Sequence, residues 1–285
     1  MAGSNLLNRP SAGLSSIVLR LIAWGMLIGF AIVIIYPLIW MILGGFKTNQ
    51  DFLSNPWGFP QSFHPGNYSK AWNLGVTNYF VNSVIVTVLT IIATTLFSAW
   101  AAYGLVKVHI PFSKQVTLLI MGGMMLAPTV ALIPLFRLLQ TLHMFDTLWA
   151  LIVLYTAFRI PFITFLIRAY MIDLPSEIDE AAHIDGASTS QIFWRIIFPI
   201  SRPILISAAV LQALFAWNEF AFALVFTSSE KVKTLPVGLV SMQSRLLTDW
   251  PLVLAGLTIA ALPMVILFLI GQKQFLRGLT EGMGK

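Results

Sequence analysis

The chain has 285 residues, a formal net charge of +6 and a mean hydropathy of +0.84. Hydrophobic residues make up 58% of it and charged residues only 10%, which is too little charge to cover a soluble globule of this size. The absence of cysteine excludes disulfides, thiolate metal sites and cysteine catalysis. The basic residues are scattered singly at the ends of apolar runs, so we expect membrane lipid around the chain and no nucleic-acid partner.

Six apolar segments are long enough to cross a bilayer as helices, which takes about 20 residues each. The predicted spans lie near residues 18–45, 78–106, 115–139, 147–171, 203–227 and 250–273. Membrane barrels show short alternating segments, whereas these runs are apolar on every face. The first run ends without a signal-peptide cleavage site and should stay as a membrane helix. The sequence therefore predicts an all-α integral membrane protein with six transmembrane helices in a single domain, residues 1–285.

The basic residues near the span ends predict the orientation of the chain. Six spans place both termini on one side, and with that side inside, it holds about ten basic residues against about six outside, which favours cytoplasmic termini. The inner residues are Arg9, Arg20, Lys107, Lys114, Arg168, Arg195, Arg202, Lys273, Arg277 and Lys285. The outer residues are Lys47, Lys70, Arg137, Lys231, Lys233 and Arg245.

The stretch between the first two spans, residues 47–78, mixes proline, glycine and aromatic residues and is typical of an ordered, turn-rich cap. Because Gly75 is a turn signal and Asn78 is polar, we expect the second span to begin near Tyr79. Polar side chains along this span favour interhelical hydrogen bonds over an ion path. They are Asn82, Ser83, Thr87, Thr90, Thr94 and Thr95.

Prolines inside the predicted spans remove backbone donors and permit kinks. They are Pro37, Pro128, Pro134, Pro161 and Pro263. Two interpretations stay open, fixed helix shapes that neighbouring helices tolerate and hinges for gating.

The most polar part of the chain follows the fourth span, and we name residues 174–200 the inner segment. Ser176 with Asp179 three residues on fits a capping box, and Gly186 can adopt the left-handed conformation that ends a helix. Ser188 and Gln191 repeat the cap for a second helix. The apolar face that follows, before Pro199, consists of Ile192, Phe193, Ile196 and Ile197.

A first helix of about eight residues is marginal in water, so it needs a surface to dock on. The small Ala181 and Ala182 would allow close approach to a partner, and Glu180 would reach a basic group across the contact. An ordinary capped helix between two spans is the alternative, and the spacing alone does not decide between them.

The residues of the inner segment also carry a family resemblance. Their order and spacing resemble the EAA motif of importer permeases of the ATP-binding-cassette (ABC) superfamily. In this chain Glu180, Ala181 and Ala182 are followed after three residues by Gly186 and, after nine more residues, by Ile196 and then Pro199. The fuller string is similar to the carbohydrate branch, especially the second permease of maltose-type systems. Further matching residues are Asp185, Phe193, Pro203, 217–220, 234–239 and 274–279.

The resemblance implies a type I ABC importer permease fold, with the inner segment as a cytoplasmic coupling loop seated on an ATPase. The partners would be a second permease forming a heterodimer, two ATPase subunits that bind ATP and Mg, and an extracellular or periplasmic solute-binding protein. The chain would not be an enzyme, would need no cofactor and would lie in the cell (plasma or inner) membrane of a prokaryote. No GxxxxGK[ST] loop occurs in it. The expected ATPase contacts are Glu180, Ala181, Ala182, Asp185, Gly186, Phe193, Ile196 and Pro199.

Ionisable groups inside a membrane are costly, so Arg159 and Glu219 need an explanation. A structural partner is favoured for Arg159, because Pro161 beside it suggests a local break. Trp217, Asn218 and Glu219 combine an aromatic face with hydrogen-bonding groups, which suits a sugar ring. The same three residues also suit packing against the partner permease. In maltose-type systems that partner supplies most substrate contacts. The candidate pathway residues are Trp217, Asn218, Glu219, Arg159 and Asn82.

Other functions stay open at this stage. An ion-coupled secondary transporter would show repeated halves and buried acids, and only Glu219 is a candidate acid. A membrane scaffold or sensor is a second alternative. Within the importer class, oligosaccharide, monosaccharide and glycerol phosphate systems share the same signature.

The four histidines lack the spacing of metal ligands and are expected in loops. They are His64, His109, His143 and His183.

Overall fold

The computed structural model describes residues 14–281 except 109, 126 and 246–248. Every regular element in these residues is helical. The long helices are α1 (Leu14–Gly45), α4 (Thr77–Lys107), α7 (Leu148–Ile172), α11 (Arg202–Asn218) and α14 (Trp250–Glu281). The shorter ones are α2 (Asn49–Ser54), α3 (Gly66–Ala71), α5 (Ser113–Met124), α6 (Leu132–Thr141), α8 (Glu177–Ile184), α9 (Thr189–Ile192), α10 (Phe198–Ile200), α12 (Ala221–Phe226) and α13 (Leu235–Arg245). Two π-helical turns, η1 (Trp72–Val76) and η3 (Phe193–Ile197), and one 3₁₀ turn, η2 (Pro128–Ala131), join neighbouring helices.

Among the described residues, four helices are long and apolar enough to cross a membrane, or up to six if each of two bent pairs is one span. The four are residues 18–45, 66–107, 148–172 and 250–269. The bent pairs are 113–124 with 128–141, bent by 86°, and 189–200 with 202–218, bent by 76°. The all-α membrane fold predicted from the sequence is confirmed. The predicted cytoplasmic position of the termini concerns residues outside the described ones and stays a prediction.

Two predicted spans, the third and the fifth, differ in shape from what the sequence indicated, and the second does not. The third is bent, because Ala127 is extended before Pro128, as the proline ring requires of the residue before it. The fifth is interrupted after Asn218, where α11 ends at an extended Glu219. The second begins as predicted: Gly75, with φ +129°, interrupts the helical stretch that starts at residue 66, and α4 begins at Thr77, close to Tyr79.

The prolines divide between breaks and continuous helices. Pro128 opens η2 at the bend of the third span. Three others lie inside unbroken helices, Pro37 in α1, Pro161 in α7 and Pro263 in α14. A membrane helix tolerates an interior proline where neighbouring groups take over the freed carbonyl. For these three the structure therefore gives a defined helix shape, and the hinge interpretation stays untested.

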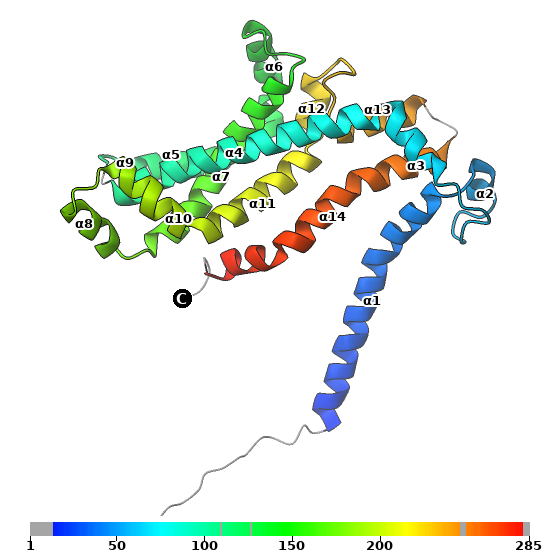
Figure 1. The fold of residues 1–285 in the computed structure, drawn as a ribbon, viewed down its shortest axis with the longest axis horizontal. Helices are drawn as coiled ribbons and strands as arrows, with labels where there is room; N and C mark the ends of the chain where they lie inside the picture. The colour runs from blue at the N-terminus through cyan, green and yellow to red at the C-terminus, as the bar shows by residue number, and fades with distance from the viewer. Residues whose placement is uncertain (1–13, 109, 126, 246–248, 282–285) are drawn as a thin grey trace, which may run out of the picture.

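Helices α4, α7, α11 and α14 form the packed bundle, and α1 diverges from it (Figure 1). Small buried residues line their contacts, including Ala99 and Ala102 on α4 and Ala208 on α11, which pack around Ile163 and Ile167 of α7. In lipid, such small residues matter because close backbone approach and van der Waals packing replace the hydrophobic driving force. The bundle is therefore held by tight contacts between helices rather than by exclusion of water.

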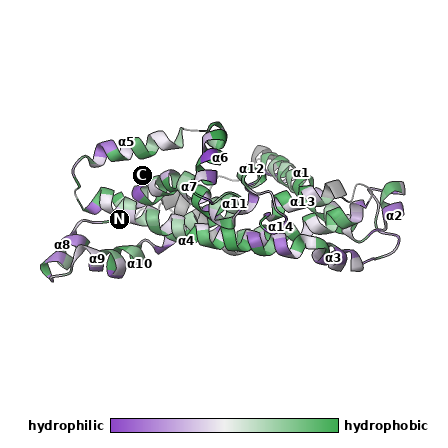
Figure 2. Cartoon of the chain, turned by 90° about the horizontal axis from the view of Figure 1, so that it is seen from above, coloured by the Kyte–Doolittle hydropathy of each residue, from purple (hydrophilic) through white to green (hydrophobic). Residues whose placement is uncertain are grey.

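The two ends of the bundle carry different elements. The inner segment, with α8, α9 and α10, lies at one end of α4, and α2, α3 and α13 lie at the other (Figure 1). Hydrophilic residues gather at both ends, in α8 and near α2 and α3, while hydrophobic residues cover the helices between them (Figure 2). This distribution fits a bundle that crosses the bilayer along α4.

Candidate functional site: the inner segment

The inner segment contains the short helix expected from the sequence. α8 spans eight residues, and Gly186 after it has φ +78°. The Ala187 amide donates to the Ala182 carbonyl at 3.0 Å and the Gly186 amide to the His183 carbonyl at 3.0 Å. This pair of bonds is the Schellman arrangement, in which a left-handed glycine satisfies the last carbonyls of a helix. The predicted end of the helix at Gly186 is confirmed.

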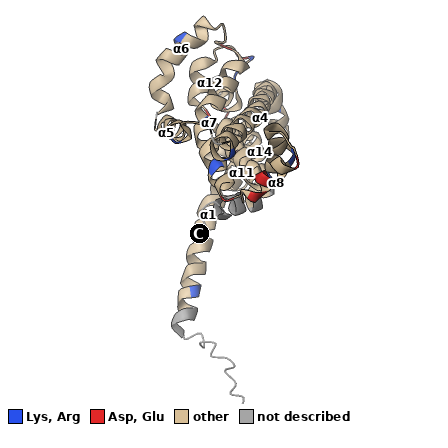
Figure 3. Cartoon of the chain, turned by 90° about the vertical axis from the view of Figure 1, so that its left-hand side faces the viewer, with Lys and Arg blue, Asp and Glu red and all other residues tan. Residues whose placement is uncertain are grey.

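The predicted cap at the start of α8 is wrong. Ser176 has helical dihedrals and makes no capping bond with its side chain. Its backbone carbonyl instead accepts from the amides of Asp179 and Glu180 at 3.0 and 3.1 Å. The capping box fails because the Asp179 carboxylate is engaged elsewhere, at 2.8 Å from the Lys107 Nζ atom at the end of α4. The acidic first turn still suits the positive end of the helix, and Figure 3 shows these acidic residues together on α8.

The second cap forms as predicted. The Ser188 Oγ atom accepts from the Gln191 amide, and the Gln191 Oε1 atom accepts from the Ser188 amide at 2.8 Å. The chain then passes through η3, whose Phe193 and Ile197 are buried against the bundle. Pro199 lies inside α10, and the chain bends by 76° before α11. The second half of the inner segment is thus packed on the bundle by its apolar face.

The residues of the motif split between two faces. Ala182 is buried and packs among residues of the bundle, whereas Ala181, Glu180 and Gly186 are exposed. Ala182 is covered by its own chain and Ala181 is the more open of the two alanines, while the expected approach of both to a partner stays a prediction. Ile184, at the end of α8, is 86% exposed and gives the helix an apolar tip. The remaining motif residues lie as follows: Asp185 exposed, Phe193 buried and Ile196 partly buried.

A polar hollow of about 690 Å³ lies between α8 and the ends of α4 and α7. Its walls include the side chains of Lys107, Asp173, Glu177, Glu180 and His183. Lys107 entered the sequence argument only as one of the inner basic residues, because nothing in its local sequence indicates a partner 72 positions away along the chain. Its role depends on the fold, which brings the end of α4 to the start of α8.

The candidate pathway residues do not form one constellation. Asn82 donates to the backbone carbonyls of Lys231 and Lys233 at 2.8 and 2.9 Å. The Trp217 indole donates to the Ala260 carbonyl on α14 at 3.1 Å, and the exposed Asn218 bonds back to the Leu214 carbonyl. Each of these three side chains is therefore tied to a separate structural partner.

Glu219 caps the start of α12. Its carboxylate accepts from the amides of Phe222 and Ala223 at 2.9 and 3.2 Å and from the Tyr155 hydroxyl of α7 at 2.6 Å. Negative charge at a helix start is stabilised by the free amides there. This carboxylate explains why the fifth span restarts immediately after its break. The sequence showed the acid but not the break that it caps.

Arg159 lies between aromatic rings. Its guanidinium carbon is 4.7 Å from the centre of the Phe162 ring and 4.8 Å from that of Phe215. Cation–π contacts of this kind compensate part of the cost of placing a charge in an apolar region. The favoured expectation of a structural partner fits this geometry, although the partner is a pair of rings and not an acid.

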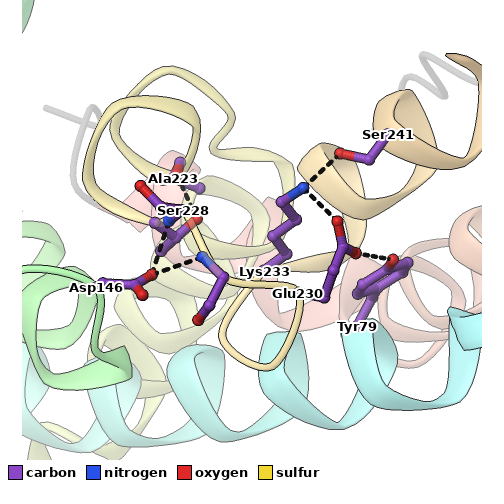
Figure 4. A network of polar contacts seen from close by, with 9 residues as sticks. Tyr79, Asp146, Ala223, Ser228, Glu230, Lys233 and Ser241 are labelled. Atoms are coloured by element: carbon purple, nitrogen blue, oxygen red, sulfur yellow. Dashed lines mark hydrogen bonds and ion pairs between the residues drawn. The ribbon is translucent and has the colours of Figure 1, made fainter.

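Residues 227–234, which we name the outer loop, are fixed by a polar network at the opposite end (Figure 4). The Lys233 Nζ atom donates to Glu230 at 2.7 Å and to Ser241 at 2.9 Å, and the Tyr79 hydroxyl donates to Glu230 at 2.5 Å. The Asp146 carboxylate accepts from the amides of Ser228 and Ser229. Burial raises the pKa of Asp146, but these amide bonds outweigh burial and hold the pKa below its ordinary value.

The histidines show no metal site in the part of the chain that the structure describes. His64 lies outside the helices and bonds to the Ser62 hydroxyl at 2.9 Å, and His143 lies in a turn with φ +54°. His183 lies in α8, so its expected loop position is wrong. His109 lies outside the described residues.

Residues 95–280 match the model of the family described as binding-protein-dependent transport system inner membrane component. The chain is 45% identical to the probable ABC transporter permease protein YurM of Bacillus subtilis, covering 92% of this chain and 87% of that protein. It is 34% identical to the trehalose/maltose transport system permease protein MalG of Thermococcus litoralis, covering 88% and 92%. A chain of a bacterial ABC transporter involved in the import of the acidic polysaccharide alginate has the same fold, with a TM-score of 0.83, 22% identity and coverage of 93% and 99%.

Proposed function

The chain belongs to the family of binding-protein-dependent transport system inner membrane components, and on that premise we propose that it is one of two permease subunits of an ATP-driven importer for a sugar of the oligosaccharide class. The complex would contain a second permease, two ATPase subunits that bind ATP and Mg, and an external solute-binding protein. Its place would be the cell membrane of a prokaryote, with both termini cytoplasmic.

The single observation that carries the proposal is the exposed helix α8. Both of its ends are stabilised within the chain, yet it leaves Glu180, Ala181 and the apolar tip Ile184 uncovered. A helix this short contributes little stability by itself, so a fixed and uncovered one is suited to insertion into a partner. We assign the ATPase as that partner. Movement of α8 as ATP binds and is hydrolysed would then bias the bundle between inward-open and outward-open states.

The names of similar proteins support the sugar class, because several are permeases of carbohydrate transport systems, such as the trehalose/maltose permease of Thermococcus litoralis. Glycerol phosphate or another polar solute is the alternative within the importer class. A secondary transporter is less well supported, because Glu219, its one candidate acid, is engaged in capping α12 and in bonding Tyr155. Within this chain, the exposed Asn218 is the group that we propose for sugar contact, together with the partner permease, whereas Trp217 is buried and bonded to the Ala260 carbonyl.

The position of α8 is tested by single cysteines, because the chain has no native cysteine. Ile184→Cys reports on α8, and Phe59→Cys, at a residue that is 78% exposed, reports on the opposite end. A membrane-impermeant maleimide is applied to right-side-out and inside-out vesicles that contain the whole complex. We expect the Phe59→Cys variant to react only in right-side-out vesicles. We expect the Ile184→Cys variant to react only in inside-out vesicles, and only after urea has stripped the peripheral subunits from the membrane. Equal labelling at 184 before and after stripping would show that no ATPase covers α8.

Transport is tested in proteoliposomes that hold the complex purified through a tag on this chain. Labelled trehalose, maltose, raffinose and glycerol 3-phosphate are supplied outside with the solute-binding protein, and Mg-ATP is trapped inside. Uptake of a sugar that needs ATP supports the proposal. Uptake of glycerol 3-phosphate alone would select the alternative substrate, and uptake driven by an ion gradient without ATP would overturn the proposed mechanism.

A further inference from the structure

Lys107, the last residue of α4, is buried at the foot of α8. Its Nζ atom lies 2.8 Å from the Asp179 Oδ2 atom and donates to the backbone carbonyls of Leu174 and Pro175 at 3.0 and 3.4 Å. The side chains of Lys107 and Asp179 are only 8% and 13% exposed. The two carbonyls that accept from this ammonium and the carboxylate that pairs with its charge all belong to the start of the inner segment.

The helix termini favour this ion pair. Lys107 lies in the last turn of α4, where the free carbonyls attract a cation, and Asp179 lies in the first turn of α8, where the free amides attract an anion. A buried pair is also screened less by salt than a surface pair. Removing one partner leaves a buried charge without compensation, which is far more disruptive than the loss of a surface ion pair.

A second contact from α4 lies one helical turn earlier. The Tyr103 hydroxyl donates to the Thr189 carbonyl at 3.3 Å, and its ring is 5.2 Å from that of Phe193. Lys107 thus contacts the inner segment before the Gly186 turn, and Tyr103 contacts it after that turn. The same helix α4 holds the outer loop at its other end through Asn82. α4 therefore runs from the exposed helix to the outer face as one continuous element.

We propose that Lys107 is a positioning residue that joins α8 to α4, so that a displacement of α8 by the ATPase moves α4 as a rigid rod. This inference rests on the proposed function, because it names how that docking contact reaches the bundle. The Lys107 Nζ atom makes the contact, and its partners are the Asp179 carboxylate and the carbonyls of Leu174 and Pro175. Lys107 contacts neither the sugar nor ATP in this scheme.

The joint is tested first by distance. Spin labels are placed on Ile184→Cys in α8 and Val88→Cys in α4, whose native side chains are 86% and 46% exposed. The pair is measured by pulsed electron spin resonance in the assembled complex, with wild-type Lys107, with Lys107→Met and with Lys107→Arg. Lys114→Met is the matched control, because Lys114 is an exposed lysine in the first turn of α5. We expect a broadened distance distribution for Lys107→Met only, with Lys107→Arg close to wild type.

Coupling is measured in the same complexes as sugar molecules imported per ATP hydrolysed. Single substitutions along a coupling route change such ratios by about two- to thirtyfold, and we expect a loss in this range for Lys107→Met and Asp179→Asn while ATP hydrolysis continues. An unchanged distance distribution or an unchanged ratio in Lys107→Met would overturn the joint. A wild-type complex without ATP-driven uptake would instead overturn the proposed function, and the label distances would still decide whether Lys107 fixes α8.

Discussion

The two ends of α4 hold their neighbours in different ways. At the outer end, several side chains of α4 bond to the outer loop and the start of α13. Asn82 donates to two carbonyls, Ser83 accepts from the Leu235 amide at 2.8 Å, and Tyr79 donates to Glu230. At the inner end, α8 itself is held by one ammonium group at its base and by the packing of Ala182, and its other face is exposed. The difference separates a polar attachment shared by several side chains from one that depends on a single ion pair.

This contrast indicates which end is built to stay fixed and which to transmit movement. Loss of one bond in a distributed network leaves the others in place, whereas loss of the Lys107–Asp179 pair leaves α8 attached to the bundle mainly through the apolar packing of Ala182. A helix that receives force from a partner needs a defined joint and an uncovered face, and α8 has both. The outer loop has no such single joint, since its backbone is bonded to two separate parts of the chain. Substitutions at the two ends should therefore differ in how far their effects spread.

The largest effect is expected at Gly238 in α13. A Cβ atom added there would lie 2.2 Å from the Tyr79 Cδ2 atom and 2.3 Å from its Cγ atom, at the rigid base of the ring. Because the ring cannot move without shifting α4, Gly238→Ala should destabilise the fold by about 3 kcal/mol, the upper range for overpacking. The measurement is the midpoint of thermal unfolding of the purified protein in detergent. Gly104→Ala in α4 is the control, since nothing lies within 4 Å of its added Cβ atom. Equal midpoints for the two variants would break the claim that the outer end is rigid.

A smaller and more local effect is expected at Gly186. An added Cβ atom meets nothing within 4 Å, so the cost of a side chain comes only from the backbone angle φ +78°. Gly186→Ala should therefore destabilise the turn that ends α8 by about 1 to 2 kcal/mol. Hydrogen exchange at the Ala187 amide, which bonds the Ala182 carbonyl, should accelerate while the thermal midpoint stays near wild type. Gly186→Asn should exchange more slowly than Gly186→Ala, because asparagine tolerates the left-handed region better. A midpoint lowered as much as in Gly238→Ala would remove the distinction between the two ends.

The parts of the fold that follow local rules were predictable from the sequence. Span length, the left-handed turn at Gly186 and the capping box of Ser188 and Gln191 each depend on residues close together in the chain. The cap at Ser176 was not predictable, because Asp179 has two possible partners and the competing one, Lys107, is supplied by tertiary structure. Local patterns thus indicate what a side chain is able to do, and the fold decides which option is taken.

The same limit applies to Glu219 and Asn82. Both were polar groups inside apolar runs, which is the pattern expected of a transport pathway as well as of a structural bond. The structure gives each a backbone partner, the amides of α12 for Glu219 and the carbonyls of the outer loop for Asn82. Neither partner has a sequence signal, because any residue supplies a backbone amide and carbonyl. Their predicted part in the pathway remains a hypothesis that the transport assay addresses.

The smallest expected effect concerns pH and the outer loop. The pKa of Asp146 is lowered from 3.8, as the amides of Ser229 and Ser228 outweigh the opposing effect of burial. A lowered pKa in the folded state means that its stabilisation is fully present above the unfolded value and is lost as the pH falls through the folded value. Exchange of the Ser228 and Ser229 amides, corrected for intrinsic rate, should therefore accelerate below about pH 4.

Asp146→Asn keeps an acceptor oxygen and tolerates the left-handed backbone of this residue, φ +59°, but it carries no charge to titrate. Its corrected exchange should show no acceleration in that window. Since Asn82 and Ser83 still hold the rest of the loop, the thermal midpoint should change little in either protein. A collapse of the whole outer end in wild type at low pH, absent from Asp146→Asn, would show that one carboxylate controls this end, as one ammonium group is proposed to control the other.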